Sequence, residues 1–545
     1  MSWWKSAVFY QIYPRSFFDS NDDGIGDLKG ITKKLDYLKW LGIDAIWISP
    51  FFKSPMLDGG YDISDYYDVD PIFGTMKDFD ELLEEAHKRN IKVIIDQVFN
   101  HTSDQHPWFQ ESKKDRTNPK ADWYIWMDPK PDGSPPNNWI SFFSGSKPQS
   151  AWEWCEERKQ YYLHLFAKEQ PDLNWRNEEV KKAIFDVMRF WLDKGVDGFR
   201  FDVVSSFFKD PKFRDIVKRK KVIAPGEITP IKEYHIFPFV GRPETFLLIE
   251  EIRDLLDSYE PERIGIGEVS SYSGLFFYLL FTLPGRLHLA FNFDFLHNLT
   301  FDAHVIYNLI KNQEDLFENL SWPCYVLGNH DVYRYISRLR YLLREEGKEI
   351  ELPRDLVSKL MATLLLTLRG TPFIYYGEEI GMENTPIPYE KIEDPMGKAL
   401  WPEKEGRDTA RTPMQWDDSK YAGFSNVEPW LPVNENKTYV NVEKEKKDKN
   451  SILNYYRNLI YKRRESLALK LGDLEFVIPG INDILAYMRV HEEERKLIIL
   501  NFSDKEKKIS IDYKGKIFIG THREEGEKID GEINLLPFEG LVIEV

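Results

Sequence analysis

The sequence predicts an α/β protein built on a (β/α)8 TIM barrel, with an inserted subdomain after strand 3 and a C-terminal antiparallel β-domain. Short apolar runs alternate with amphipathic helical segments along most of the 545 residues. The runs are continuously apolar, as is typical of parallel strands that are buried on both faces. Eight such strand–helix units close a barrel. Near the C-terminus the pattern changes to short alternating strands with turns, which indicates a separate domain.

Eight apolar runs can be placed in order along the chain. They are VFYQIYP (8–14), DAIWIS (44–49), KVIIDQVF (92–99), DGFRFDVV (197–204), RIGIGEV (263–269), LHLAFNF (287–293), PCYVLGN (323–329) and TPFIYYGEE (371–379). Amphipathic segments such as DFDELLEEAHKRN and EEVKKAIFDVMRFWLDKG lie between them and predict the covering helices. The pattern alone leaves a doubly wound open sheet as the alternative.

One excursion interrupts the alternation of strands and helices. Residues 102–170 are rich in Pro, Trp and Asp and have no barrel period, and a long excursion of this kind is commonly a functional insertion. Short alternating strands begin after residue 465. We therefore divide the chain into a first barrel part (1–101), an inserted domain (102–170), a second barrel part (171–464) and a C-terminal β-sandwich domain (465–545).

Composition excludes several classes of function. A net charge of −17 argues against binding of nucleic acid, which needs a basic surface. Two widely separated cysteines give no disulfide framework. The N-terminus lacks the pattern of a signal peptide, and the longest apolar stretch is too short to span a bilayer. We expect a cytoplasmic protein with no membrane partner. Its charge, rich in Lys and Glu, resembles that of proteins from hot environments.

The stretch DSNDDGIGD (19–27) predicts a cation-binding loop. Side-chain oxygens alternate along it, Gly24 allows a sharp turn, and the backbone carbonyl of Ile25 adds a further oxygen. The side chains concerned are those of Asp19, Asn21, Asp23 and Asp27. Six to eight oxygens suit Ca²⁺, and Mg²⁺ is the alternative. An EF-hand needs Glu at the twelfth position, where this chain has Gly30. We therefore expect a structural ion, with an acidic solvated turn as the other interpretation.

Ionisable residues recur at the carboxyl ends of the predicted strands, which is where a TIM barrel forms its active site. They are Asp96, Asn100, His101, Arg200, Asp202, Glu268, His330 and Asp331. A single buried carboxylate is commonly part of a structural ion pair. Several that converge on one rim are difficult to explain by packing, because unpaired buried charges are costly. Their convergence predicts a catalytic site.

These residues lie in segments that resemble glycoside hydrolase family 13, the α-amylase family, over essentially the whole chain. The segments are DQVFNH (96–101), QPDLNW (170–175), GFRFDVV (198–204), GIGEV (265–269) and LGNHD (327–331). GYDISDY (60–66) and GRDTARTPMQWDD (406–418) resemble its α-glucosidase and oligo-1,6-glucosidase branch. In that branch the loop after the first strand binds a structural Ca²⁺. The resemblance implies an α-glucosidase that acts on small oligosaccharides.

The resemblance also implies catalytic roles for three carboxyl groups. Asp202 matches the nucleophile, Glu268 the acid/base and Asp331 the carboxylate that binds sugar hydroxyls. A retaining glycosidase needs its two catalytic carboxyls about 5–5.5 Å apart, which neighbouring strands can provide. Arg200 lies two residues before Asp202 on the same face of the strand, so we expect it to lower the pKa of Asp202 and keep this group ionised.

Further matches concern recognition of the sugar. His101 and His330 match histidines that bind sugar hydroxyls, and Tyr61 matches an aromatic platform beneath the sugar. Asp62 and Arg407 match a pair that binds the non-reducing end and closes the pocket, which implies exo-action.

Val203, directly after the nucleophile, implies acceptance of α-1,6 linkages. The SSFFKDPKFRD segment that follows it resembles instead the broader α-glucosidases.

Other members of the family remain as alternatives. The RLDRD segment of sucrose isomerases is missing, and the corresponding region reads YNLIKNQEDLFENL. Trehalose-6-phosphate hydrolase and trehalose synthase stay open. A non-catalytic binding module is disfavoured because all three carboxyl residues are present. The sequence does not indicate the oligomeric state.

Overall fold

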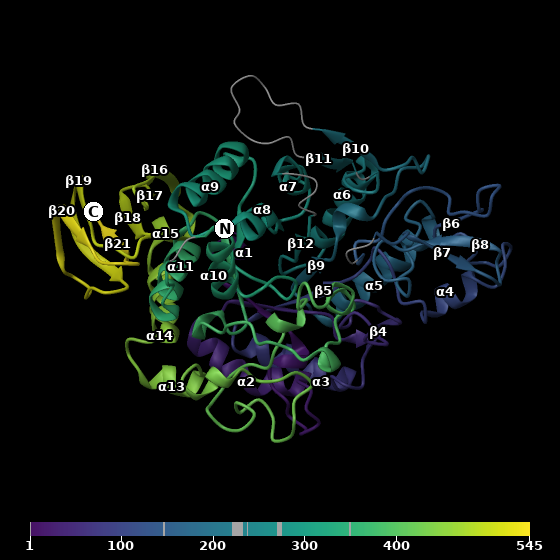
Figure 1. Ribbon diagram of the computed structural model, residues 1–545, viewed down its shortest axis with the longest axis horizontal. Coiled ribbons are helices and arrows are strands. Elements are labelled where there is room, and N and C mark those ends of the chain that lie inside the picture. Colours follow the sequence, from purple (N-terminus) through teal and green to yellow (C-terminus); the bar gives the residue numbers. More distant parts are fainter. Residues whose placement is uncertain (1, 145–147, 221–232, 237, 270–274, 348–349) are drawn as a thin grey trace.

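Eight parallel strands form the largest sheet in the described part of the chain (Figure 1). The structure is a computed structural model that describes residues 2–144, 148–220, 233–236, 238–269, 275–347 and 350–545. In chain order the strands are β1 (Phe9–Ile12), β2 (Ala45–Ile48), β5 (Lys92–Gln97), β9 (Gly198–Phe201), β12 (Ile264–Gly267), β13 (Leu289–Ala290), β14 (Cys324–Val326) and β15 (Thr371–Tyr375). Each coincides with one of the eight predicted apolar runs, and nearly every residue in them is buried.

The order of strand pairing closes the sheet into a barrel. Each strand from β2 to β13 pairs with the barrel strand before it in the chain, and β1 pairs in parallel with both β2 and β15. β14 pairs with β15. The backbone N–H of Asn292, just past β13, donates to the carbonyl of Cys324 in β14 at 3.3 Å, which brings the sixth and seventh strands side by side. The open-sheet alternative is therefore wrong.

Helices cover the outside of the barrel (Figure 1). They are α2 (Leu28–Leu41), α3 (Met76–Lys88), α5 (Glu178–Lys194), α6 (Pro243–Asp257), α7 (Leu275–Thr282), α9 (Ala303–Phe317), α10 (Tyr335–Glu345) and α11 (Arg354–Thr367). The short helix α8 (Phe293–Asn298) follows β13 directly. Their ends follow local sequence signals. Thr75 and Asp78 form a capping box at the start of α3. Gly195 ends α5 with φ 104°, a left-handed conformation that glycine adopts without strain.

The inserted domain is built around a small antiparallel sheet. Within the described residues this sheet has the order β6-β8-β7, from β6 (Trp126–Met127), β7 (Trp152–Cys155) and β8 (Gln160–Leu163), and a short helix α4 (Pro107–Ser112) precedes it. Its apolar core includes Trp139 and Trp152, but also Ile216 and Phe239 from the segment after β9. The predicted boundary at residue 170 therefore leaves out part of this core.

A short hairpin, which the sequence did not predict, lies in the same segment after β9. It consists of β10 (Val217–Lys220) and β11 (Glu233–Ile236), paired antiparallel. On the first half of the barrel, β3 (Phe52–Lys53) and β4 (Asp65–Val69) form another short antiparallel pair between β2 and α3.

The C-terminal domain is antiparallel, as predicted, but its strands form one continuous sheet. Among the described residues the order is β16-β17-β18-β21-β19-β20. The strands are β16 (Asp473–Ile481), β17 (Ile484–His491), β18 (Glu494–Asn501), β19 (Lys507–Gly520), β20 (Lys528–Leu535) and β21 (Gly540–Glu544). Because β21 pairs with both β18 and β19, all six strands belong to one hydrogen-bonded sheet, and apolar side chains from β17 to β21 share one core. The arrangement of these strands as a sandwich stays a prediction.

Four further helices lead from the barrel into this domain: α12 (Pro395–Leu400), α13 (Val442–Lys447), α14 (Ile452–Glu465) and α15 (Leu467–Leu471). The sheet is fixed to the barrel by buried contacts, such as the 2.6 Å hydrogen bond between the hydroxyls of Thr367 and Tyr487. The C-terminal sheet and the inserted sheet lie at opposite ends of the molecule, with the barrel between them (Figure 1). No helix in the described ranges has both the length and the apolar character needed to cross a membrane.

Candidate active site

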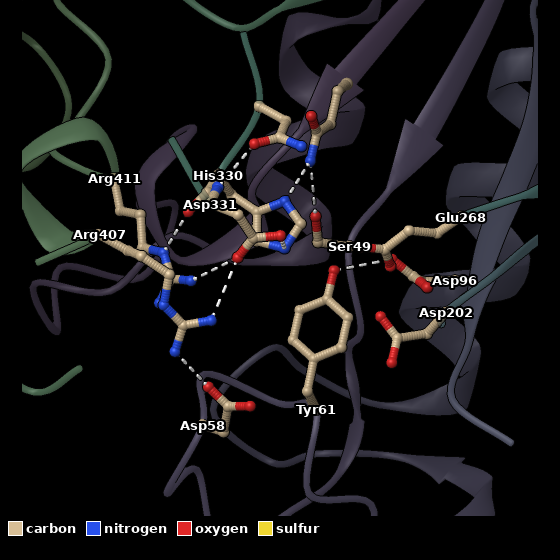
Figure 2. Close-up of polar contacts among 12 residues, drawn as sticks. Ser49, Asp58, Tyr61, Asp96, Asp202, Glu268, His330, Asp331, Arg407 and Arg411 are labelled. Carbon is tan, nitrogen blue, oxygen red and sulfur yellow. Dashed lines mark hydrogen bonds and ion pairs between the residues drawn. The ribbon is translucent and has the colours of Figure 1, made fainter. Parts of the chain in front are cut away.

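The predicted catalytic carboxyl groups meet at the carboxyl ends of β5, β9 and β12 (Figure 2). Parallel register places Asp96 of β5 beside Arg200 of β9. One step further along, the backbone N–H of Asp202 donates to Gln97 O at 3.0 Å, and that of Glu268 donates to Phe201 O at 2.9 Å. The ladder thus continues past the strand ends and holds Asp202 and Glu268 on adjacent strands.

A single guanidinium joins three carboxylates. Nη1 of Arg200 lies 2.8 Å from Asp96 Oδ1 and 2.8 Å from Asp202 Oδ1. Nη2 of Arg200 contacts Glu268 Oε2, which also accepts the backbone N–H of Val203 at 3.2 Å. All four side chains are buried or nearly so. The predicted arginine is therefore present, but it serves all three acids rather than Asp202 alone.

This sharing corrects the expected protonation of the predicted nucleophile. Burial, and then the negative charge of Glu268, raise the pKa of Asp202 well above its usual range, although Arg200 acts in the opposite direction. Burial likewise raises the pKa of Asp96 to about 6 against the effect of the same arginine. One positive charge among three buried carboxyl groups therefore favours the retention of a proton in the site without substrate.

Tyr61 and His330 form a stacked pair across the site. Their ring centroids lie 5.2 Å apart and their planes are 5° from parallel. The hydroxyl of Tyr61 donates to Asp96 Oδ2 at 2.9 Å, which fixes the ring in the cavity wall. Tyr61 lines the cavity, and its role as a platform for the sugar stays a prediction.

Both predicted histidines are neutral at pH 7. Burial lowers the pKa of His101 to about 4 and that of His330 to about 3. Gln11 donates to His330 Nδ1 at 2.8 Å, which leaves the proton of the ring on Nε2. His101 Nε2 lies 3.1 Å from the carbonyl oxygen of Tyr61. Neutral rings suit hydrogen bonding to uncharged hydroxyls better than proton transfer.

Asp331 has surroundings opposite to those of Asp202. Its Oδ1 lies 3.1 Å from Arg407 Nη1 and 3.3 Å from Arg411 Nη2 (Figure 2). Burial acts against ionisation, but the positive groups around Asp331 outweigh it and hold the pKa of this carboxyl below its usual range. Asp331 is thus an anion at every ordinary pH. A permanent carboxylate is a strong acceptor for sugar hydroxyls.

The predicted partner of Arg407 is wrong. Nη2 of Arg407 contacts Asp58 Oδ1 at 2.7 Å and Asp394 Oδ1 at 2.7 Å. Asp62 accepts hydrogen bonds from the Ser54 hydroxyl and from the backbone N–H groups of residues 57 and 58. Asp62 therefore holds the turn, and Asp58 of this turn reaches the site. No local sequence signal singles out Asp58, because its partner Arg407 lies 349 residues away.

Val203 has an unusual backbone. Its φ is 35° and its ψ 42°, a left-handed conformation that is strained for a β-branched residue. The side chain lines the cavity, and the backbone N–H points at Glu268. Strain at this position is the cost of turning the chain sharply after the predicted nucleophile.

A cavity of about 420 Å³ opens above these groups. This volume falls within the range of small-molecule sites. All three catalytic candidates line it, together with Tyr61, His101, Val203, His330, Asp58 and Arg407. Its wall also contains apolar side chains that the sequence did not single out, namely Phe142, Phe143, Phe166, Phe293, Val332 and Met396. Phe143 lies under the Arg407 guanidinium at 4.9 Å, so an apolar wall and a charged end meet there.

The 19–27 loop uses its carboxylates differently from the prediction. Asp19 accepts the backbone N–H groups of residues 21, 22 and 24 and the hydroxyl of Ser425. Asp27 caps α2 through the N–H of Gly30 at 2.7 Å. Asn21 donates to Asp23. Within the described ranges no group of three or more His, Cys, Asp or Glu side chains is arranged to hold a metal. This geometry does not gather a ligand set, and binding of Ca²⁺ there stays a prediction.

Comparisons with known proteins cover most of the chain. Residues 11–472 match the family described as alpha amylase, catalytic domain. The chain is 42% identical to an oligo-1,6-glucosidase of Heyndrickxia coagulans over 96% of both chains. It is 41% identical to a probable alpha-glucosidase of Rhizobium meliloti (strain 1021), over 98% of this chain and 95% of the relative.

Solved structures resemble the whole chain as well. The alpha-glucosyl transfer enzyme XgtA has a TM-score of 0.90 at 41% identity and covers 100% of this chain and 99% of its own. An isomaltulose synthase mutant from Erwinia rhapontici NX5 has a TM-score of 0.89 at 36% identity, with the same coverage.

Proposed function

Because this chain belongs to the α-amylase family of glycoside hydrolases, we propose that it is a retaining, exo-acting α-glucosidase of short oligosaccharides that also accepts α-1,6 linkages. One observation carries the proposal. Asp202 and Glu268 bind the same guanidinium beside a 420 Å³ cavity, which Asp58, Asp331 and Arg407 also line. Two carboxyl groups held this close favour the retaining separation over the wider inverting one.

In the first step, the ionised carboxylate of Asp202 attacks the anomeric carbon of the terminal glucose. Glu268 transfers its proton to the glycosidic oxygen, the bond between that oxygen and the anomeric carbon breaks, and the rest of the sugar leaves as an alcohol. The product is a covalent glucosyl ester on Asp202. Arg200 holds both carboxyl groups in register throughout this step.

In the second step, Glu268 acts as a base. It takes a proton from a water molecule, whose oxygen attacks the same anomeric carbon and displaces Asp202 as a carboxylate. Two inversions give net retention, so glucose is released as the α-anomer. Asp331 remains anionic and accepts hydrogen bonds from ring hydroxyls in both steps.

Exo-action is supported by a cluster of ion-paired residues in the cavity wall. Arg407 is held there by Asp58, Asp394 and Asp331, all within 3.1 Å, and Phe143 lies against its guanidinium. Such a fixed cluster offers hydrogen-bond partners to the hydroxyls of a terminal glucose. Val203 in the cavity wall and the oligo-1,6-glucosidase relative support acceptance of α-1,6 linkages.

A sucrose isomerase is the second candidate, and the isomaltulose synthase structure favours it. Both reactions share the first step. They differ in what attacks the glucosyl ester: water gives hydrolysis, whereas the retained fructose gives a rearranged disaccharide.

Initial rates on maltose, isomaltose, sucrose and p-nitrophenyl α-glucoside, with the released anomer followed by NMR, test the proposal. We expect α-glucose from the first two sugars and from the aryl glucoside. Release of β-glucose would overturn the catalytic assignment, and a rearranged disaccharide from sucrose with little free glucose would establish the isomerase.

A further inference from the structure

Two exposed aromatic side chains form a pair on the segment that joins β15 to Arg407. Tyr389 is 52% exposed and Trp401 is 37% exposed. Their ring centroids lie 5.8 Å apart with the planes tilted by 43°. Isolated exposed aromatic residues are ordinary on protein surfaces. A pair that presents its rings together, on a segment attached to a sugar-sized cavity, calls for a ligand.

Both ends of the segment that carries Trp401 are fixed at the cavity. Met396 lines the cavity in the first turn of α12, and Trp401 follows directly after this helix. The helix rises 1.5 Å per residue, so the backbone of Trp401 lies about 8 Å beyond that of Met396. On the other side, Arg407 returns to the site and binds Asp394 through its backbone N–H at 2.8 Å. Residues 396–407 thus form a short excursion from the cavity wall, and Trp401 lies at its tip.

A second strand-end loop contacts the same excursion. Val332 lines the cavity directly after Asp331. The next residue, Tyr333, lies near Glu405 of the excursion. The excursion and the loop after β14 therefore meet beside the cavity.

The residues that flank Tyr389 pack against a later segment of the chain. Ile387 and Ile392 are buried in a small apolar core with Leu431. Lys391 forms a 2.6 Å ion pair with Glu428. A surface that is already ordered loses little conformational entropy when a ligand binds to it.

We propose that Tyr389 and Trp401 form a sugar-binding surface outside the cavity, which stacks on an outer ring of the oligosaccharide leaving group. The proposal rests on the function proposed above, since it extends the substrate outward from the same cavity. The apolar C–H faces of a pyranose ring match the face of an indole or phenol, and both residues keep a polar tip for the hydroxyls. An uncharged surface of this kind selects for the length of the sugar rather than for the type of bond that is cleaved.

The test compares substrates of different length. The variants are Trp401→Ala, Tyr389→Ala and Trp401→Phe, and the readout is kcat/KM for an α-linked glucose tetrasaccharide divided by kcat/KM for p-nitrophenyl α-glucoside. Loss of one stacking contact should lower this ratio about five- to tenfold in Trp401→Ala, through KM. Trp401→Phe keeps an aromatic face and should recover most of the ratio. Because each variant is compared with itself, a partly unfolded preparation cannot imitate the effect.

Trp154 provides a matched control. It is also 37% exposed and pairs with a tyrosine, Tyr161, at 5.1 Å. It lies on β7 of the inserted domain, and neither end of this strand lines the cavity. Trp154→Ala should leave the ratio unchanged. An equal fall of the ratio in Trp154→Ala and Trp401→Ala, or no fall in either, overturns the inference.

Binding without turnover separates this inference from the proposed function. The tetrasaccharide is titrated calorimetrically into Asp202→Asn and into Asp202→Asn combined with Trp401→Ala. A five- to tenfold weaker Kd in the double variant supports the surface, even if the wild-type protein hydrolyses no α-glucoside. An unchanged Kd refutes it, even if hydrolysis is fully established.

Discussion

The Asp58–Arg407 pair yields the sharpest prediction, because the sequence assigned this role to Asp62. Asp58→Asn keeps the shape of the side chain but removes the charge that Arg407 meets at 2.7 Å. Arg407 retains Asp394 and Asp331, so it is not left as an isolated buried charge. Hydrogen bonds to charged groups contribute about 1.5–3 kcal/mol. If the terminal glucose binds this pair, kcat/KM should fall by about 10–150-fold, with a modest change in the unfolding midpoint.

Asp62→Asn is the comparison. Asp62 is buried, burial raises its pKa to about 6, and its three hydrogen bonds are all to its own turn. An amide can replace only some of these acceptors, so we expect a loss of about 1–3 kcal/mol in the free energy of unfolding and a smaller loss of kcat/KM than in Asp58→Asn. Rates on p-nitrophenyl α-glucoside and thermal unfolding of both variants decide the matter. A larger kinetic loss in Asp62→Asn, with its unfolding midpoint intact, would refute our assignment.

Three further predictions concern protonation, a buried ion pair and the cation loop. Glu268→Gln removes a negative charge that, together with burial, raises the pKa of Asp202. On p-nitrophenyl α-glucoside, which needs little acid assistance, the acid limb of the pH profile of kcat/KM should therefore move to lower pH. An acid limb that stays in place or moves to higher pH contradicts the coupling of the two groups. Lys209→Met leaves Asp172, its fully buried partner at 2.6 Å, without a counter-charge, and denaturant unfolding should show a loss of about 3–5 kcal/mol. If the 19–27 loop binds Ca²⁺, the ion at a hundredfold excess over Kd should add about 2.7 kcal/mol, chelation should lower the unfolding midpoint, and an Asp23→Ala variant should not respond; equal responses argue against the site.

The barrel was predictable from sequence because parallel strands buried on both faces appear as continuous apolar runs. β2 and β5, for example, are apolar runs that can be recognised without knowing their partners. The candidate catalytic carboxyl groups were found in the same way, since they lie at the ends of such runs. The C-terminal β19 was harder. It spans 14 residues, and a turn-like stretch interrupts its apolar alternation, so its full length is not evident from the sequence pattern.

Contacts between distant segments of the chain have no corresponding local sequence pattern. Asp58 and Arg407 are 349 residues apart, and nothing local to Asp58 indicates a partner. The core of the inserted domain likewise includes Ile216 and Phe239, which follow β9 and which no periodicity connects with residues 102–170. The protonation of Asp202 was mispredicted for a related reason. Its neighbour Arg200 could be read from the sequence, but the two other carboxylates on that arginine could not.

The sharing of Arg200 also indicates how the site favours its transition state. Asp96, Asp202 and Glu268 meet one guanidinium in a buried cavity, so the site without substrate has too little positive charge and retains a proton. In the proposed reaction, positive charge develops on the sugar ring as the glycosidic bond breaks. That charge supplies the positive charge that the three carboxyl groups lack, and Asp331 adds a fourth anion to the same cavity. Because this attraction is strong only when the ring is cationic, it lowers the barrier without tightening the binding of the neutral substrate.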